Sequence, residues 1–272
     1  MIATLRYEFL MQVRRPVMWI VYALTVAVLL ATGPGFSTLS LGGSDARDAK
    51  TAMVLLAPIM MTLMPIVYGC MLADRLVRDR RLGVDAVLDT TPADRTGRLV
   101  GKYLGACAAT AVPFLAAYFA RALVYVVAEG RPSALGWAVA VFVTTVVPGL
   151  LFTGALALAG PLLMPPMLFR VLFVVYWFCF VVIPPSVLPS PSYSIISPEG
   201  DYMRYGLYRE GLAEGEVYRP STAYAALDET GYFNFLRPDA TPATALLWAA
   251  LMLALALALL ALVRLHAART ES

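Results

Sequence analysis

Six apolar stretches alternate with polar segments along this chain. They lie roughly at residues 17–33, 52–73, 103–127, 135–160, 168–189 and 243–264. Each is long enough to cross about 30 Å of hydrocarbon, because an α-helix rises about 1.5 Å per residue. The pattern therefore predicts an all-α, polytopic membrane protein, with six transmembrane helices in a single domain over residues 1–272.

Residues 1–16 show a different pattern, in which apolar and polar side chains fall on two sides of one helix. The apolar side chains share one broad arc: Ile2, Leu5, Phe9, Leu10 and Val13. Glu8 and Arg14 lie on the other side. This arrangement predicts a helix that lies in the membrane interface. The alternative is that these residues are simply the solvated start of the first span.

Four prolines interrupt the apolar stretches: Pro58, Pro65, Pro113 and Pro148. A proline removes one backbone hydrogen bond, and lipid offers no substitute partner, so neighbouring helices must satisfy the freed carbonyl groups. The prolines therefore predict kinked helices that pack against one another.

Composition excludes an ordinary soluble domain. Of the 272 residues, 60% are hydrophobic and 14% are charged, whereas about a quarter of the residues in a soluble domain are charged. The net charge is +3 and the isoelectric point about 8.8, but the charges cluster between apolar stretches and do not follow one face. We therefore expect no nucleic-acid partner.

The distribution of Arg and Lys predicts the orientation. With the N-terminus inside, thirteen of them fall in the cytoplasmic segments and seven in the outer ones. Cytoplasmic connections carry the excess of basic residues in membrane proteins. The sequence therefore predicts a multi-pass protein of the cell membrane, the inner membrane of a bacterium, with both termini in the cytoplasm.

The cytoplasmic connection, residues 74–101, is the most highly charged part of the chain. Within it Val84, Val87 and Leu88 recur at helical spacing, whereas Asp85 and Asp89 lie away from that stripe. This spacing predicts a short amphipathic helix. The helix either docks in a groove on another protein or is a solvated linker.

The same connection resembles the cytoplasmic loop of ABC-2 type transporter permeases. In that family a charged cluster is followed by Gly, an acidic residue, apolar positions, Thr-Pro, Arg and a later Gly-Lys. The matching residues in this chain are Arg78-Asp79-Arg80, Gly83, Asp85, Val87-Leu88, Thr91-Pro92, Arg95 and Gly101-Lys102. An N-terminal interfacial helix, six spans and a long outer connection before the last span are also similar to the family.

The resemblance implies a coupling helix that docks on an ATP-binding subunit. The residues that it assigns to this coupling are Gly83, Val84, Asp85, Val87, Leu88, Thr91, Pro92 and Arg95. The expected partners are two copies of an ABC ATPase, which bind ATP and Mg, and a second permease, either an identical copy or a homologue. The apolar spans suit a hydrophobic or amphipathic substrate such as a peptide, drug or lipid.

The chain lacks the motifs that would make it an enzyme by itself. A phosphate-binding loop has the form GxxxxGK[ST], and the nearest segment, Gly97 to Tyr103, is one residue short and ends in Tyr. His266 is the only histidine, which excludes multi-His metal sites and His-dependent triads. We therefore expect no catalytic residue, no metal and no cofactor in this chain.

Two other classes of function remain open. One is a non-transporting membrane scaffold or regulatory anchor that uses the same cytoplasmic connection to hold a partner. The other is a proton- or ion-coupled carrier, which is disfavoured because the spans lack a carboxylate relay. Arg121 lies inside an apolar stretch, either as a functional charge or as a side chain that extends to the outer surface.

The outer connection, residues 190–241, is rich in tyrosine. Seven tyrosines fall in it: Tyr193, Tyr202, Tyr205, Tyr208, Tyr218, Tyr224 and Tyr232. Tyrosine is favoured where an apolar ring meets a wet surface. The segment is therefore expected to be an interfacial cap on the bundle, an exit gate or a contact for an external partner, and no substrate-binding residue is assigned.

Overall fold

The structure, a computed structural model, describes residues 2–32, 48–73, 75, 95–183, 190–220 and 233–269. The described residues form helices and no β-strand, apart from one isolated bridge between Tyr218 and Ala240. The all-α prediction is therefore confirmed for this part of the chain. The predicted coupling residues between 83 and 92 lie outside it.

The long helices follow the apolar stretches. In chain order the elements are α1 (Ile2–Val13), α2 (Pro16–Thr32), α4 (Ala49–Leu72), α7 (Arg95–Glu129), α8 (Ser133–Val141), η1 (Phe142–Val146), α9 (Val147–Leu163), α10 (Pro166–Trp177), η2 (Phe178–Val182), η3 (Met203–Leu207), η4 (Asn234–Leu236) and α12 (Pro242–Arg269). The π-helical turn η1 joins two of the helices, the π-helical turn η2 continues a third, and the short elements η3 and η4 lie in the outer connection.

Four helical stretches are long and apolar enough to cross a membrane: Ala49–Leu72, Thr96–Glu129, Ser133–Leu163 and Pro242–His266. The pair α1 and α2 meets the same criteria only together, and a bend of 62° separates the two helices. α10 has 12 residues and continues into η2 as far as Val182. The described residues thus contain four helices that are long and apolar enough to span a membrane, or five with the bent pair, and six spans remain a prediction.

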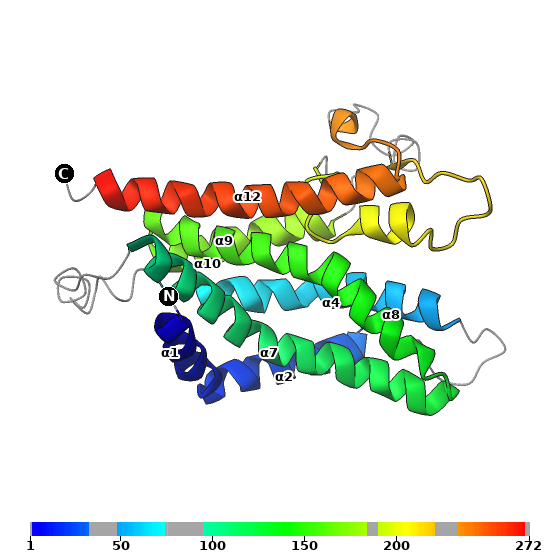
Figure 1. Ribbon diagram of the computed structural model, residues 1–272, viewed down its shortest axis with the longest axis horizontal. Coiled ribbons are helices and arrows are strands. Elements are labelled where there is room, and N and C mark those ends of the chain that lie inside the picture. Colours follow the sequence, from blue (N-terminus) through cyan, green and yellow to red (C-terminus); the bar gives the residue numbers. More distant parts are fainter. Residues whose placement is uncertain are drawn as a thin grey trace.

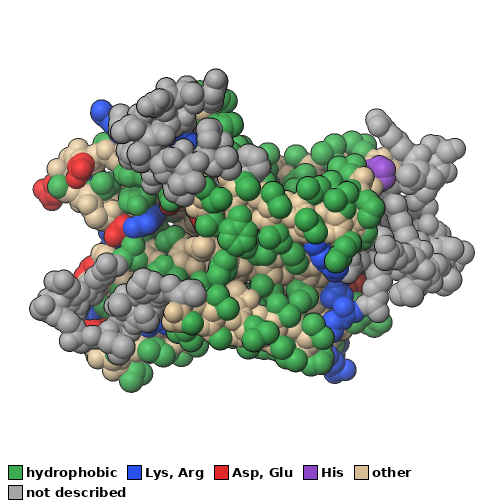
Figure 2. All heavy atoms as spheres, turned by 180° about the vertical axis from the view of Figure 1, so that it is seen from behind, with side chains coloured by type: hydrophobic (Ala, Val, Ile, Leu, Met, Phe, Trp, Pro, Cys, Tyr) green, Lys and Arg blue, Asp and Glu red, His purple; other side chains and the backbone are tan. Residues whose placement is uncertain are grey.

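The helices run side by side, and their ends gather at two poles of the molecule (Figure 1). One pole holds α1, the start of α7 and the C-terminal part of α12, and we call it the basic end. At the opposite pole, residues 190–220 and 233–241 lie near the starts of α8 and α12, and we call these residues the cap segment. Figure 2 shows hydrophobic side chains over the middle of the molecule and Lys and Arg gathered near one pole.

α4 is the central helix of the bundle, and it packs against α2, α7, α8, α9 and α10. Met53, Met60, Met61 and Met64 are completely buried along it. Methionine side chains are flexible enough to fill irregular gaps between bent helices. α4 therefore provides the apolar core around which the other helices are arranged.

Side-chain hydrogen bonds lie beside two of the prolines, and a π-helical turn precedes a third. Pro58 and Pro65 lie inside α4, where Thr62 Oγ1 donates to the Pro58 carbonyl at 2.9 Å and Trp177 Nε1 of α10 donates to the Thr62 carbonyl at 2.9 Å. Pro148 is the second residue of α9, which continues from the π-helical turn η1. Because proline has no N–H group to donate, the π-helical turn lies where the regular α-helical hydrogen bonding is interrupted. The kinks expected at the prolines stay a prediction.

The apolar arc of α1 is partly exposed: Ile2 is 77% and Leu10 40% exposed, whereas the other three residues of the arc are half-buried. Glu8 and Gln12 are buried against the bundle. Two polar side chains of α1 therefore pack on protein, and the main neighbour of α1 is α7. The position of α1 in the membrane interface stays a prediction. Hydrophobic periodicity alone indicates two different faces but does not show which of them meets protein.

Candidate functional site

Most of the predicted coupling residues lie outside the described part of the chain, but the two ends of their connection are described. Gly83, Val84, Asp85, Val87, Leu88, Thr91 and Pro92 lie outside the described residues. Of the predicted set only Arg95 is placed, as the first residue of α7. The chain leaves α4 after Leu72 and re-enters the bundle at Arg95, so both attachment points of this connection lie at the basic end (Figure 1).

α1 packs tightly against α7 just beyond the second attachment point. A Cβ atom on Gly105 would lie 2.6 Å from the Leu5 carbonyl oxygen, so only glycine permits this approach. Gln12 Nε2 donates to Thr110 Oγ1, and Thr110 Oγ1 in turn donates to the Ala106 carbonyl at 2.9 Å. The N-terminal helix and the first turns of α7 therefore form one packed unit.

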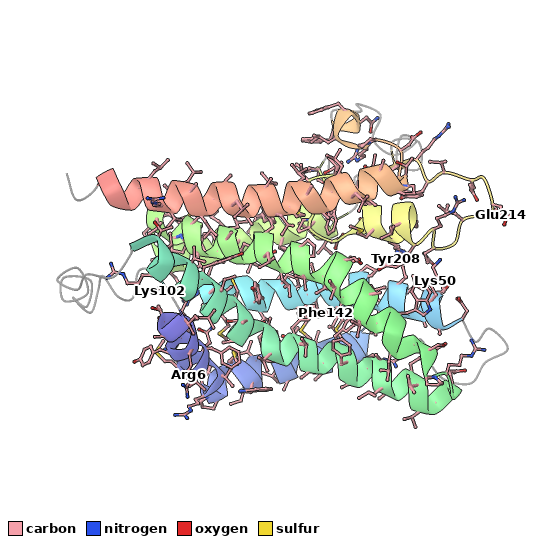
Figure 3. The ribbon with its side chains drawn as sticks, in the orientation of Figure 1. Arg6, Lys50, Lys102, Phe142, Tyr208 and Glu214 are labelled. Atoms are coloured by element: carbon pink, nitrogen blue, oxygen red, sulfur yellow. The ribbon has the colours of Figure 1, made fainter. Side chains whose placement is uncertain are left out.

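Basic side chains dominate this end. They come from several segments: Arg6, Arg14, Arg15, Arg75, Arg98, Lys102, Arg170 and Arg264. Figure 3 shows Arg6 and Lys102 at this pole, far from Lys50 and Glu214 at the other. Glu8 is the one carboxylate among the described residues at this end of these helices, since Glu129 lies at the far end of α7. By the excess of basic residues on the cytoplasmic side of membrane proteins, the basic end is the candidate cytoplasmic end.

The cap segment at the opposite pole is held together by a buried arginine. Arg237 is 2% exposed, and its guanidinium donates to the carbonyl oxygens of Ser190 at 2.6 Å and Ser192 at 3.3 Å and to Asn234 Oδ1 at 3.1 Å. The Tyr202 hydroxyl adds a hydrogen bond to the Pro238 carbonyl at 3.1 Å. These bonds join the part of the cap segment before residue 221 to the part after residue 232.

The cap segment is inserted into the helix bundle. Trp248 Nε1 of α12 donates to the Ser197 carbonyl at 2.8 Å. A Cβ atom on Gly149 of α9 would lie 2.6 Å from the Pro198 carbonyl oxygen. Gly200 has a φ of +87°, and a Cβ atom there would lie 2.2 Å from Thr145 Cγ2 of η1. Residues 197–200 therefore depend on glycine for both their backbone conformation and their close approach to the bundle.

This insertion buries two carboxyl groups. Glu199 and Asp201 are 9% and 7% exposed. They line a hollow together with Val54 and Pro58 of α4, Val141 of α8 and Thr145 of η1, and the lining atoms leave no room for a water molecule. No hydrogen-bond partner for Asp201 Oδ2 exists among the described residues. The bundle side of the hollow is thus apolar apart from the Thr145 hydroxyl.

Burial controls the protonation of both groups. Removal from water disfavours the charged form of a carboxyl group. Burial raises the pKa of Asp201 from 3.8 to about 6, against the opposing influence of the Arg204 charge. Burial also raises the pKa of Glu199 well above its usual range, and the neighbouring Asp201 charge raises it further. Arg204 itself is engaged by Glu210 at 2.8 Å.

The predicted tyrosines divide between the core and the surface of the cap segment. Tyr202 and Tyr208 are buried, and the Tyr208 hydroxyl lies 2.7 Å from Thr144 Oγ1 of η1. Tyr205 and Tyr218 stack with ring centroids 3.9 Å apart. Tyr224 and Tyr232 lie outside the described residues. The interpretation as a cap on the bundle therefore fits the described tyrosines.

Sequence reasoning did not single out Glu199 and Asp201. The carboxylate relay expected of a coupled carrier would lie in the spans, whereas these two residues lie in the outer connection. The available signal was the segment Pro198-Glu199-Gly200-Asp201, in which a glycine separates two acids between apolar spans. Arg121, the charge expected inside a span, is buried in α7. Among the described residues no group of three His, Cys, Asp or Glu side chains is arranged to hold a metal ion.

The fold and the two poles define an all-helical protein whose long apolar helices suit a membrane, with a basic end and a capped end. In comparisons with protein-family models and with curated proteins, none matches this chain.

Proposed function

We propose that this chain is the membrane-spanning permease subunit of an ABC exporter and that a separate ATPase subunit drives it. The observation that carries the proposal is the place where the connection of residues 74–94 attaches. Its sequence contains a helical stripe of Val84, Val87 and Leu88. Its attachment points on α4 and α7 lie at the basic end, where positive charge favours a cytoplasmic position.

The packing around these attachment points supports the transmission of force. α1 is fitted against Gly105 of α7, and Arg170 of α10 donates to the Cys70 carbonyl of α4 at 3.2 Å. A movement of the connection would therefore be transmitted to α1, α4, α7 and α10 together. Rigid-body movement of packed helices is one of the established ways in which a local contact changes the state of a whole protein.

In this proposal the ATPase hydrolyses ATP, and the present chain forms the route of the substrate through the membrane. Two ATPase subunits bind ATP and Mg, and two permeases, identical or homologous, enclose the route of a hydrophobic or amphipathic substrate. Closure of the ATPases pushes the residues near 84–91. The bundle then moves between states that open toward the basic end and toward the capped end.

The proposal is tested by exchanging two apolar residues of the stripe for charged ones. The chain is purified from the membranes of its own cells, and two properties are measured: the ATPase activity that co-elutes with it and the presence, by mass spectrometry, of a polypeptide with a GxxxxGK[ST] motif. The variant carrying Val87→Asp and Leu88→Asp is expected to lose most of both, because buried carboxylates are unfavourable in an apolar contact.

The matched control carries the same two charges at the other pole. Val217→Asp and Phe235→Asp replace side chains that are 40% and 79% exposed in the cap segment, and this variant should retain the ATPase. Undiminished ATPase in the Val87 and Leu88 variant would refute the docking role. Co-elution of a partner that lacks a nucleotide-binding motif would favour the scaffold function.

A further inference from the structure

The two buried carboxyl groups of the cap segment pose an electrostatic problem. If both Glu199 and Asp201 were charged, two negative charges would lie two residues apart in a hollow with no room for water. A buried charge without a partner is strongly unfavourable, and a carboxyl group in such a place binds a proton instead. The hollow also contains Thr145 Oγ1, which is 3% exposed and has no hydrogen-bond partner among the described residues.

No positively charged side chain in the surroundings takes the place of the proton by neutralising both carboxyl groups. From the cap segment, Arg204 lines the hollow and its charge opposes the effect of burial on Asp201, but its guanidinium is engaged by Glu210 at 2.8 Å. The guanidinium of Arg237 is held by backbone carbonyls. Further titratable groups on that side are Tyr202, Tyr205, Tyr208, Glu210 and Asp239. From α4, Lys50 lies 5.8 Å from the Trp137 ring. Elsewhere the surroundings of the hollow are uncharged: Val54, Pro58, Val141, Thr145 and Trp248.

We propose that Glu199 and Asp201 form a proton-binding site that fastens the cap segment into the bundle, with a carboxyl proton as the ligand. We call the state with the cap segment inserted in the bundle the closed state. In it at least one of the two groups is a neutral acid, which can donate to the other carboxyl group or to the Thr145 hydroxyl. Loss of the proton leaves two charges that water can stabilise only when residues 197–208 move outward. The inference does not depend on the proposed ATPase.

Side-chain hydrogen bonds between described residues attach this part of the cap segment to the helices and would open in such a movement. The hydrogen bonds from Trp248 to Ser197 and between Tyr208 and Thr144 join residues 197–208 to α12 and η1. Both partners of the second bond are at or beside π-helical turns, η1 and η3. π-helical turns often occur at functional positions in proteins, where they interrupt the regular α-helix.

The direction of the pH dependence follows from the binding of the proton. The closed state holds the proton more tightly than the open state, in which the carboxyl groups meet water and have pKa values near 4. Closure is therefore fully stabilised below about pH 4 and loses that stabilisation as the pH rises through the raised pKa values. For Asp201 this value is about 6, and for Glu199 burial raises the pKa well above its usual range.

Hydrogen exchange of the full chain in lipid nanodiscs tests the proposal. The protection factor of residues 197–208, which corrects for the intrinsic exchange rate at each pH, is measured at pH 4 and pH 8. We expect a fall of at least about tenfold in the unmodified chain, because each pH unit between the open-state pKa near 4 and the Asp201 pKa of about 6 in the closed state changes the equilibrium about tenfold. Residues 150–158 of α9 should keep their protection.

Variants identify the groups responsible. Glu199→Gln with Asp201→Asn replaces both acids by neutral groups of the same shape, so the protection found at pH 4 should persist at pH 8. Glu214→Gln removes an exposed acid of the same segment and should behave like the unmodified chain. Equal protection at both pH values in the unmodified chain would overturn the proposal, as would an equal loss of protection in α9 or a pH-dependent double variant.

Discussion

Arg237 is the residue on which the integrity of the cap segment most depends. Its guanidinium is almost fully buried, and its planar fork reaches Ser190, Ser192 and Asn234 at the same time. A lysine presents a single ammonium group and lacks this geometry. The side chain thus connects two parts of the cap that are more than forty residues apart in the sequence.

Replacement of Arg237 should destabilise the protein measurably. Arg237→Met leaves buried carbonyl groups without a donor, and we expect the free energy of unfolding to fall by about 3 kcal/mol. The midpoint of thermal unfolding in detergent should then fall by roughly 6–12 °C. Arg219→Met is the control, because the Arg219 side chain is 61% exposed and its contact with Asp239 at 3.5 Å is a surface ion pair. An equal shift in both variants would contradict this role of Arg237.

At the scale of the helices, the contact between α1 and α7 is the most closely fitted feature of the basic end. Gly105 lies where a side chain would meet the Leu5 backbone. Gly136 in α8 has no atom near its missing Cβ. The two glycines therefore form a matched pair, one in a tight helix contact and one in open space.

Exchange of each glycine for alanine should have opposite effects. Alanine favours a helix over glycine by up to about 1 kcal/mol, so Gly136→Ala should raise the midpoint of thermal unfolding. Gly105→Ala forces α1 away from α7, and overpacking of this kind costs about 1–3 kcal/mol, so its midpoint should fall. Hydrogen exchange should report faster exchange in α1 for Gly105→Ala alone. A rise in stability for both variants would show that α1 does not rest on Gly105.

The long helices were predictable because the length of an apolar run reports directly on a span. The stretch 103–127 is found inside α7, and 135–160 is found inside Ser133–Leu163. Two features of these helices were not predicted: α7 begins earlier, at Arg95, and η1 interrupts the second stretch. Hydropathy gives no weight to a charged but helical first turn, and it is insensitive to a single π-helical turn.

The candidate sites were harder to predict from the sequence than the helices. The segment Pro198-Glu199-Gly200-Asp201 shows that two acids lie close together in the sequence, but charged residues in a connection are expected to meet water, so the sequence does not predict their burial. Their burial depends on contacts with Thr145 and Trp248, which are about fifty residues away in the chain. The coupling stripe near Val87 was found because its helical spacing is local. Its position stays a prediction, since these residues lie outside the described part of the chain.

At the scale of the whole molecule, the two poles differ in charge and in construction. The basic end carries arginine and lysine from α1, α7, α10 and α12, whereas the cap segment carries acids as well as bases, among them Glu199, Asp201 and Glu210. Apolar side chains occupy the region between the poles (Figure 2). This asymmetry is the basis for assigning the basic end to the cytoplasm, and the proposed ATPase contact requires that assignment.

The side from which residue 87 can be reached tests this requirement most directly. Val87→Cys and Glu214→Cys are made separately, and a membrane-impermeant maleimide is applied to intact cells and then to permeabilised cells. The parent chain, with Cys70, Cys107 and Cys179 in place, gives the background. We predict that Cys at 214 reacts in intact cells and Cys at 87 only after permeabilisation. Reaction at 87 in intact cells would contradict a cytoplasmic coupling helix and, with it, the proposed exporter.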